Sequence, residues 1–125
     1  MDLGWPTWIG VVVEDFDGQR VFYRDILRLR ELRAGEDFVW FEFGDGRLLD
    51  VLRRSDDDPT SARTGFQVGF AVEDVEAARE ELLGCGVEPV GGILGGPKAG
   101  SRWACFRDAE GNVFQVTQHL EPPSV

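Results

Sequence analysis

Residues 7–15 read TWIGVVVED, and residues 66–74 read FQVGFAVED. When Ile9 is placed on Val68, a glycine, a valine, a glutamate and an aspartate coincide at a constant offset of 59 residues. Both stretches are rich in β-branched and aromatic residues, which is typical of a β-strand. The chain therefore begins the same structural unit twice.

A second internal match lies further along the chain. GDGRLLDVL at 44–52 aligns with AEGNVFQVT at 109–117, at an offset of 65 residues. The second half thus carries extra residues between the two matches, and we expect them in the glycine-rich stretch at 90–100. Two copies are too few for a stacked repeat array, so we expect the copies to bury each other's apolar faces.

Each copy predicts a strand, a helix and three further strands. In the first copy Asp15 and Asp17 suit a helix start, and Phe22, Ile26 and Leu29 recur at helical spacing. The GDG turn between two apolar runs predicts a hairpin. The strand expected around 29–35 has the weakest pattern of the first copy.

The second copy repeats this order. Its expected helix carries Val75, Ala78 and Leu82 on one face and ends at Gly84. Strands are expected around VEPVGGI, RWACFR and VFQVTQHL, and the glycine-rich stretch is either a lid or a plain loop. We therefore predict a single domain over residues 1–125, with modules at 6–52 and 65–120 and a polar linker at 53–64.

Composition narrows the function classes. A net charge of −10 disfavours nucleic acid as a partner and mildly favours cationic or neutral ligands. A negative charge more commonly serves only to keep a protein soluble. Apolar runs fall well short of the roughly 20 residues that span a membrane, and the start MDLGWPTW is unlike a secretion signal. We expect a cytoplasmic protein in which Cys85 and Cys105 are reduced structural thiols rather than zinc ligands.

Strand alternation divides the side chains of the repeated strand between two faces. Ile9, Val11 and Val13 share one face in the first copy, and we expect that face to meet the helix. The opposite face is small, with Gly10 in the first copy and Gly69 in the second. Such a face marks the close approach of a ligand or a tight crossing of strands, and the sequence leaves both open.

The hairpin extends this second face. If Phe43 pairs with Arg47 around GDG, then Trp40 faces Asp50 across the hairpin, and the offset of 65 residues places Cys105 near Gln115. The predicted concave ligand-binding surface consists of Trp8, Trp40, Asp50, Gln67, Trp103, Arg107 and Gln115.

At this point the chain resembles a known superfamily. FYRDILRL at 22–29, FRDAEGNVFQV at 106–116 and the V-x-D ending of both first strands are similar to the vicinal oxygen chelate proteins. These include glyoxalase I, fosfomycin and bleomycin resistance proteins, extradiol dioxygenases and methylmalonyl-CoA epimerase. The resemblance covers roughly residues 6–120. It implies an α+β fold in which two βαβββ modules form curved mixed sheets around a cavity, and a homodimer.

The resemblance also implies four metal-ligand positions, at the start of each first strand and in the middle of each last strand. The residues at these positions are Trp8, Asp50, Gln67 and Gln115. An indole nitrogen only donates hydrogen bonds, and one carboxylate with two amides is a poor set for zinc, iron or nickel. A magnesium-type site of oxygen ligands stays open. His119 shares strand parity with Gln115, but four residues separate them, so we expect it at the surface.

Two functions from different classes follow. The first is a metal-free small-molecule binding protein of the glyoxalase/bleomycin resistance type that sequesters a cationic or aromatic compound and has no cofactor. Trp8, Trp40 and Trp103 would then offer stacking and cation–π faces, unless they belong to the core. The alternative is a divalent-metal-dependent lyase, isomerase or dioxygenase in which Asp50 acts as the catalytic base. The sequence names no ligand and leaves open whether the modules pack within one chain or swap between chains.

Overall fold

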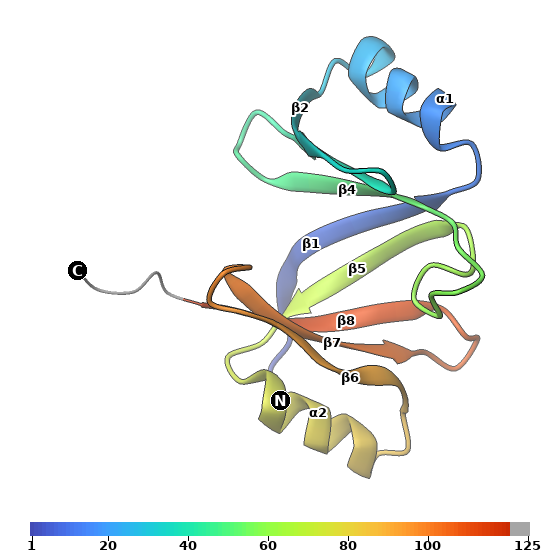
Figure 1. Cartoon of the computed structure of the whole chain (residues 1–125). Helices are drawn as coiled ribbons and strands as arrows, with labels where there is room; N and C mark the ends of the chain where they lie inside the picture. Colours follow the sequence, from blue (N-terminus) through green and yellow to red (C-terminus); the bar gives the residue numbers. More distant parts are fainter. Residues whose placement is uncertain (121–125) are drawn as a thin grey trace. The chain divides into compact units, whose positions relative to one another are not determined.

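The computed structural model describes residues 1–120 and divides them into two compact units (Figure 1). One unit contains Trp8–Gln67, and the other contains residues 1–7 together with the chain from Val68 onward. Each unit has four strands and a helical segment, so the predicted α+β class and the repeated βαβββ order are confirmed. In the described part of the chain, no helix is long and apolar enough to cross a membrane.

The unit formed by Trp8–Gln67 has the strand order β2-β3-β4-β1. Strands β1 and β4 run parallel, and the other two neighbouring pairs are antiparallel. The bounds of the elements are β1 (Gly4–Val13), α1 (Phe16–Val21), the π-helical turn η1 (Phe22–Ile26), β2 (Arg30–Ala34), β3 (Phe38–Glu42) and β4 (Leu48–Arg53).

The core of this unit lies between the helical segment and one face of its strands. Val11 and Val13 of β1 contact Phe16, Phe41 and Val51 there, as the alternation of β1 and of the hairpin predicts. Ile9, which shares this face of β1, lies at its exposed end. The opposite face is therefore left to Trp8, Gly10 and their neighbours across the strands.

The predicted helical stripe of the first module is wrong for Phe22 and Ile26 and correct for Leu29. Phe22 is 42% exposed and Ile26 is 66% exposed, whereas Tyr23 and Leu29 pack against the core. The cause is the π-helical turn, which begins at Phe22 and changes the angular phase of the side chains. A pattern with a constant 3.6 residues per turn therefore selects the wrong residues within this turn.

The second unit has the strand order β5-β8-β7-β6, with β5 and β8 parallel. Val75, Ala78 and Leu82 of the helix pack against Phe106 and Val116, so the predicted stripe is confirmed here. The bounds of the elements are β5 (Gly65–Ala71), α2 (Val75–Gly84), β6 (Glu88–Gly96), β7 (Ser101–Arg107) and β8 (Val113–His119).

The glycine-rich stretch is mostly strand, so its interpretation as a loop or lid is wrong for residues 90–96. The pairing register of β6 with β7 shifts between Val90 and Ile93, which leaves Gly91 and Gly92 as a bulge. Gly91 has a φ of 76°, a conformation that glycine adopts without strain. The extra residues therefore lengthen a strand and do not build a separate loop.

The repeated aspartates at the ends of TWIGVVVED and FQVGFAVED have the same local task. Asp15 accepts a hydrogen bond from the backbone N–H of Gly18, and Asp74 accepts from the N–H groups of Glu76 and Ala77. Both side chains thus cap a helix N-terminus, where four backbone donors lack intrahelical partners.

Replacing the cap of the longer helix should destabilise the fold. We expect Asp74→Ala to lower the free energy of unfolding by about 1 kcal/mol, because two N–H groups lose their acceptor. Urea unfolding followed by circular dichroism measures this change. Glu73→Ala, at the exposed neighbouring position, is the control and should stay within about 0.5 kcal/mol of the parent. Equal effects of the two variants would contradict the capping role.

Candidate functional site

Three strands bring the candidate residues of the first unit into one row. Gly10 of β1 is the register partner of Asp50 on β4, and Asp50 is in turn the partner of Trp40 on β3. The backbone N–H of Phe43 donates to the carbonyl of Arg47 at 2.7 Å, so the hairpin closes as predicted and the Trp40–Asp50 pairing is confirmed. The Asp50 side chain therefore lies on β4 between a glycine of β1 and a tryptophan of β3.

The small face of β1 is filled by the chain itself. A Cβ atom placed on Gly10 would lie 2.2 Å from Cη2 and 2.5 Å from Cζ2 of Trp8. The Trp8 ring is therefore folded back along its own strand, over the place where Gly10 has no side chain. In this structure the group that approaches the glycine is an indole of the same strand, which the sequence pattern did not predict.

The carboxyl group of Asp50 has a strongly shifted pKa. Burial raises the pKa of its carboxyl group to about 6, and hydrogen bonding from the Trp8 and Trp40 side chains opposes the rise. The two indoles satisfy the carboxyl only in part, since Oδ1 is buried without a hydrogen-bond partner among the described residues. We name Trp8, Gly10, Trp40 and Asp50 the Asp50 cluster.

Two further side chains fix the position of Trp40. The guanidinium carbon of Arg33 lies over the Trp40 ring, 5.5 Å from the centroid, and the Phe38 ring lies 5.7 Å away, centroid to centroid. These contacts are cation–π and aromatic interactions, each of which contributes about 0.5–1.5 kcal/mol. Arg33 is not among the residues that the sequence predicts for this surface. The register shift between Glu31 and Arg33 moves its strand position, and no alternation rule finds that shift.

The two glutamines of the predicted site already have partners. Nε2 of Gln67 donates to the backbone carbonyl of Thr60 at 2.6 Å, which ties β5 to the segment before it. Gln115 is buried, and its Oε1 accepts from the hydroxyl of Thr117 at 3.0 Å. The side chains of Gln115 and Thr117 fill the space over Gly69. A Cβ atom there would lie 2.8 Å from Oγ1 of Thr117 and 3.1 Å from Gln115.

Trp103 and Arg107 lie with Gln115 in the second unit. Cys105 is the register partner of Gln115, as the offset between the copies predicts. Trp103 is half-buried, and its ring lies over Gly95, where a Cβ would be 2.5 Å from Cζ3. Nη1 of Arg107 lies 3.4 Å from Oε1 of Glu88, an exposed ion pair. Each of these side chains thus has a local partner within its own unit.

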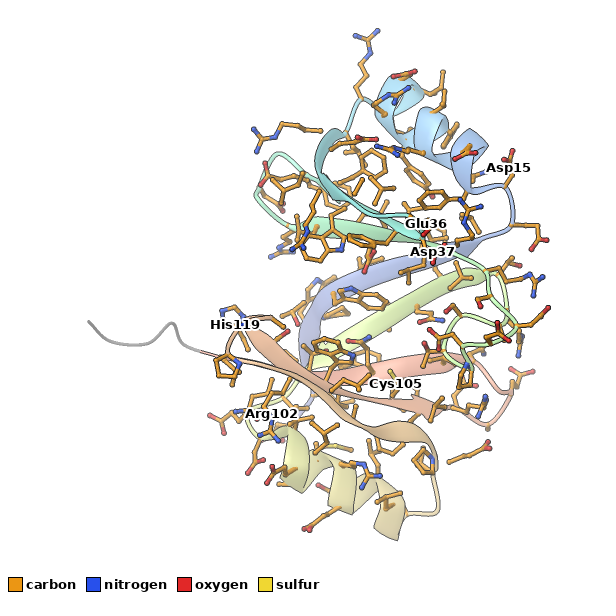
Figure 2. All side chains as sticks on the ribbon, viewed as in Figure 1. Asp15, Glu36, Asp37, Arg102, Cys105 and His119 are labelled. Atoms are coloured by element: carbon orange, nitrogen blue, oxygen red, sulfur yellow. The ribbon has the colours of Figure 1, made fainter. Side chains whose placement is uncertain are left out.

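The cysteines and the histidine lie outside the Asp50 cluster. Cys85 is exposed, Cys105 is buried, and no disulfide joins them. His119 is exposed at the end of β8, as expected (Figure 2).

The donors at the four positions that the superfamily uses for a metal do not suit one. Trp8 offers only a donor N–H, and its ring rests on Gly10. Oε1 of Gln115 already accepts from Thr117, and Gln67 holds the backbone of Thr60. Within residues 1–120, no group of three or more His, Cys, Asp or Glu side chains is placed to hold a metal ion. The residues present therefore do not fit the metal centre that the superfamily implies.

Comparison with known proteins agrees with this architecture. The sequence profile of the glyoxalase-like domain matches residues 8–117. The chain therefore belongs to the glyoxalase-like domain family, within the vicinal oxygen chelate superfamily. A search of curated protein sequences gives no match.

Solved structures share the fold at low sequence identity. A Streptomyces coelicolor methylmalonyl-CoA epimerase in complex with 2-nitronate-propionyl-CoA has a TM-score of 0.69 and 18% identity, over 96% of this chain and 100% of that one. A Mn(II)-bound glyoxalase from Novosphingobium aromaticivorans has a TM-score of 0.70 and 18% identity, over 98% of this chain and 42% of that one. A glyoxalase/bleomycin resistance protein/dioxygenase superfamily member from Vibrio splendidus 12B01 has a TM-score of 0.66 and 14% identity, over 89% of this chain and 96% of that one.

The raised pKa of Asp50 predicts a specific pH dependence of stability. The folded state binds this proton more tightly than the unfolded state, since the pKa rises from 3.8 to about 6 on folding. The contribution of Asp50 is therefore favourable below about pH 4 and is lost as the pH rises through 6. Between pH 4 and pH 7, we expect the free energy of unfolding of the parent to fall by about 2–3 kcal/mol relative to that of Asp50→Asn.

Urea unfolding at intervals across this pH range measures the difference between the two proteins. Asp57→Asn removes an exposed carboxyl group and serves as the control, with a difference from the parent that stays flat. A flat difference for Asp50→Asn as well would show that its carboxyl is solvated in the folded protein.

Proposed function

We propose that this chain is a metal-free small-molecule binding protein of the glyoxalase/bleomycin resistance type that takes up a cationic or aromatic compound. The observation that carries the proposal is the Asp50 carboxyl, which lies between two indoles at a position where the superfamily's metalloenzymes place a metal ligand. Its neighbours in the row, Trp8 and Trp40, bring π-faces and donor N–H groups in place of metal-binding atoms.

Charge supports a cationic ligand. The net charge of the chain is −10, and such a field raises the local concentration of cations near the protein. The Asp50 carboxyl is mostly ionised above its pKa of about 6, so it carries a negative charge at pH 7 and above. An indole face attracts a cation with about 0.5–2 kcal/mol, as the Arg33 guanidinium over the Trp40 ring illustrates, and a second indole, Trp8, lies beside the same carboxylate.

The alternative is an enzyme, a divalent-metal-dependent lyase, isomerase or dioxygenase of the same superfamily. The observation in its favour is the pKa of Asp50, because a general base works best when its pKa lies near the working pH. Trp8 and the bonded amides of Gln67 and Gln115 count against it. We therefore rank this function second.

The proposal also includes a homodimer in the cytoplasm. Four strands in each unit are consistent with paired modules, and the pairing of modules between chains is common to the superfamily that the sequence resembles. Sedimentation equilibrium over a range of concentrations measures the mass directly. A single species at the 13.9 kDa of the chain would remove the homodimer from the proposal.

Elemental analysis of the purified protein separates the two functions. We expect zinc, iron, nickel, cobalt and manganese far below one equivalent in the parent and in Asp50→Ala alike, because the donor set is poor. Near-stoichiometric metal that disappears in Asp50→Ala would favour the enzyme. A thermal-shift panel tests the binding function itself, with stabilisation expected from aromatic cations and none from aromatic anions of similar size.

Replacement of Trp8 by histidine should create a metal-binding site, which the parent lacks. We expect Trp8→His to bind Co²⁺ at least tenfold more tightly than the parent, because an imidazole then stands beside the Asp50 carboxylate. Visible absorption of bound Co²⁺ reports the coordination. Trp40→His is the matched control, since it also flanks Asp50 but is not at a ligand position. Equal binding by both variants would mean that the ligand positions are assigned wrongly.

A further inference from the structure

The Asp50 cluster contains an acceptor that the chain does not satisfy. Oδ1 of Asp50 has no hydrogen-bond partner, and among the described residues only one other buried side-chain atom, Nε of Arg79, shares this condition. Native proteins rarely leave a buried carboxyl oxygen unpaired, because it loses its hydrogen bonds to water on folding. The unpaired oxygen is therefore an acceptor that a donor from outside the chain can bind.

The carboxyl also lacks a counter-charge. Burial and the two indoles account for its altered pKa, and no charged side chain of residues 1–120 contributes to it. Two arginines of β2 are engaged with other groups. Arg33 lies over the Trp40 ring, and Arg30 on the same strand pairs with Glu42. An ionised Asp50 thus has two indole N–H groups beside it and no cation of its own.

We propose that the ligand of this site is a primary or secondary organic ammonium attached to a flat apolar group, and that its N–H donates to Oδ1 of Asp50 between the rings of Trp8 and Trp40. This inference rests on the proposed binding function and specifies the chemistry of the ligand.

The N–H group is the deciding part of this ligand. A quaternary ammonium carries the same charge and binds an indole face equally well, but it has no hydrogen to donate. It would leave Oδ1 of Asp50 unpaired, and a buried acceptor without a donor weakens binding. A site made only of aromatic rings would instead accept both ions. The ratio of the two affinities therefore reports whether Asp50 or the rings select the ligand.

Oδ1 is buried, so a covering group must move before a ligand reaches it, and the two indoles that hydrogen-bond to this carboxyl are the candidates. Trp40 is held by the Phe38 ring and the Arg33 guanidinium. The Trp8 ring hydrogen-bonds to Asp50 as Trp40 does, and it rests on the bare backbone of Gly10. Trp8 is therefore the ring that swings aside, and Gly10 is the residue that lets it lie over the strand in the resting state.

Three compounds with one ring system test the proposal by isothermal titration calorimetry at pH 7.5. Tryptamine is a primary ammonium, its N,N,N-trimethyl derivative is quaternary, and tryptophol is the neutral alcohol. We expect tryptamine to bind the parent at least tenfold more tightly than either of the others, and Asp50→Asn to lose this preference. Asp57→Asn, with an exposed carboxyl group removed, should behave as the parent does.

Different failures have different meanings. Equal affinity for tryptamine and the quaternary derivative would overturn the role of Asp50 and leave the binding function intact. If none of the three compounds binds, the proposed function fails as well.

Gly10→Ala provides a second variant that does not alter the carboxyl group. Its Cβ would come within 2.2 Å of Cη2 of Trp8 and must displace the ring. We expect tighter binding of tryptamine, by about threefold or more, because the ring has already left its resting position. Weaker binding would mean that the resting ring is itself part of the bound state, and would overturn the movement of Trp8. A thermal melt of each variant confirms that it is folded.

Discussion

The parallel pairing of β1 with β4 is the constraint on which the first unit depends. It places Val11 beside Val51 on the face that meets the helix, and Gly10 beside Asp50 on the other face. A slip of one residue would turn Asp50 into the apolar core and Val51 out of it, so the register is held by the burial of both core valines. The position of the carboxyl group is thus a by-product of core packing.

Alternation and internal repetition predict much of this arrangement. The equivalence of Asp15 and Asp74, the facing of Trp40 and Asp50, and the buried stripe of α2 all follow from spacing, because strands and regular helices have fixed periods. The predictions are wrong where the spacing of residues along a helix or strand changes. The π-helical turn at Phe22 and the bulge at Gly91 each alter the count of residues per repeat, and no propensity scale signals either.

The candidate site was harder to predict than the fold, for a different reason. Strand parity assigns Trp8 to the correct face but gives no rotamer, so it does not foresee that the ring lies along the strand over Gly10. An aromatic residue two positions before a glycine on the same face is the only signal available, and it acquires meaning once the backbone is known. The partners of Gln67 and Gln115 are likewise local contacts that depend on side-chain conformation.

The outer strands of the two units share a feature with a further consequence. The register of β2 shifts between Glu31 and Arg33, and that of β6 shifts between Val90 and Ile93, each at the end of its four-stranded order. An irregular edge is a poor template for an incoming strand, since the spacing of free backbone donors and acceptors is broken. The same irregularities that break the strand pattern therefore make both edges poor sites for aggregation by sheet extension.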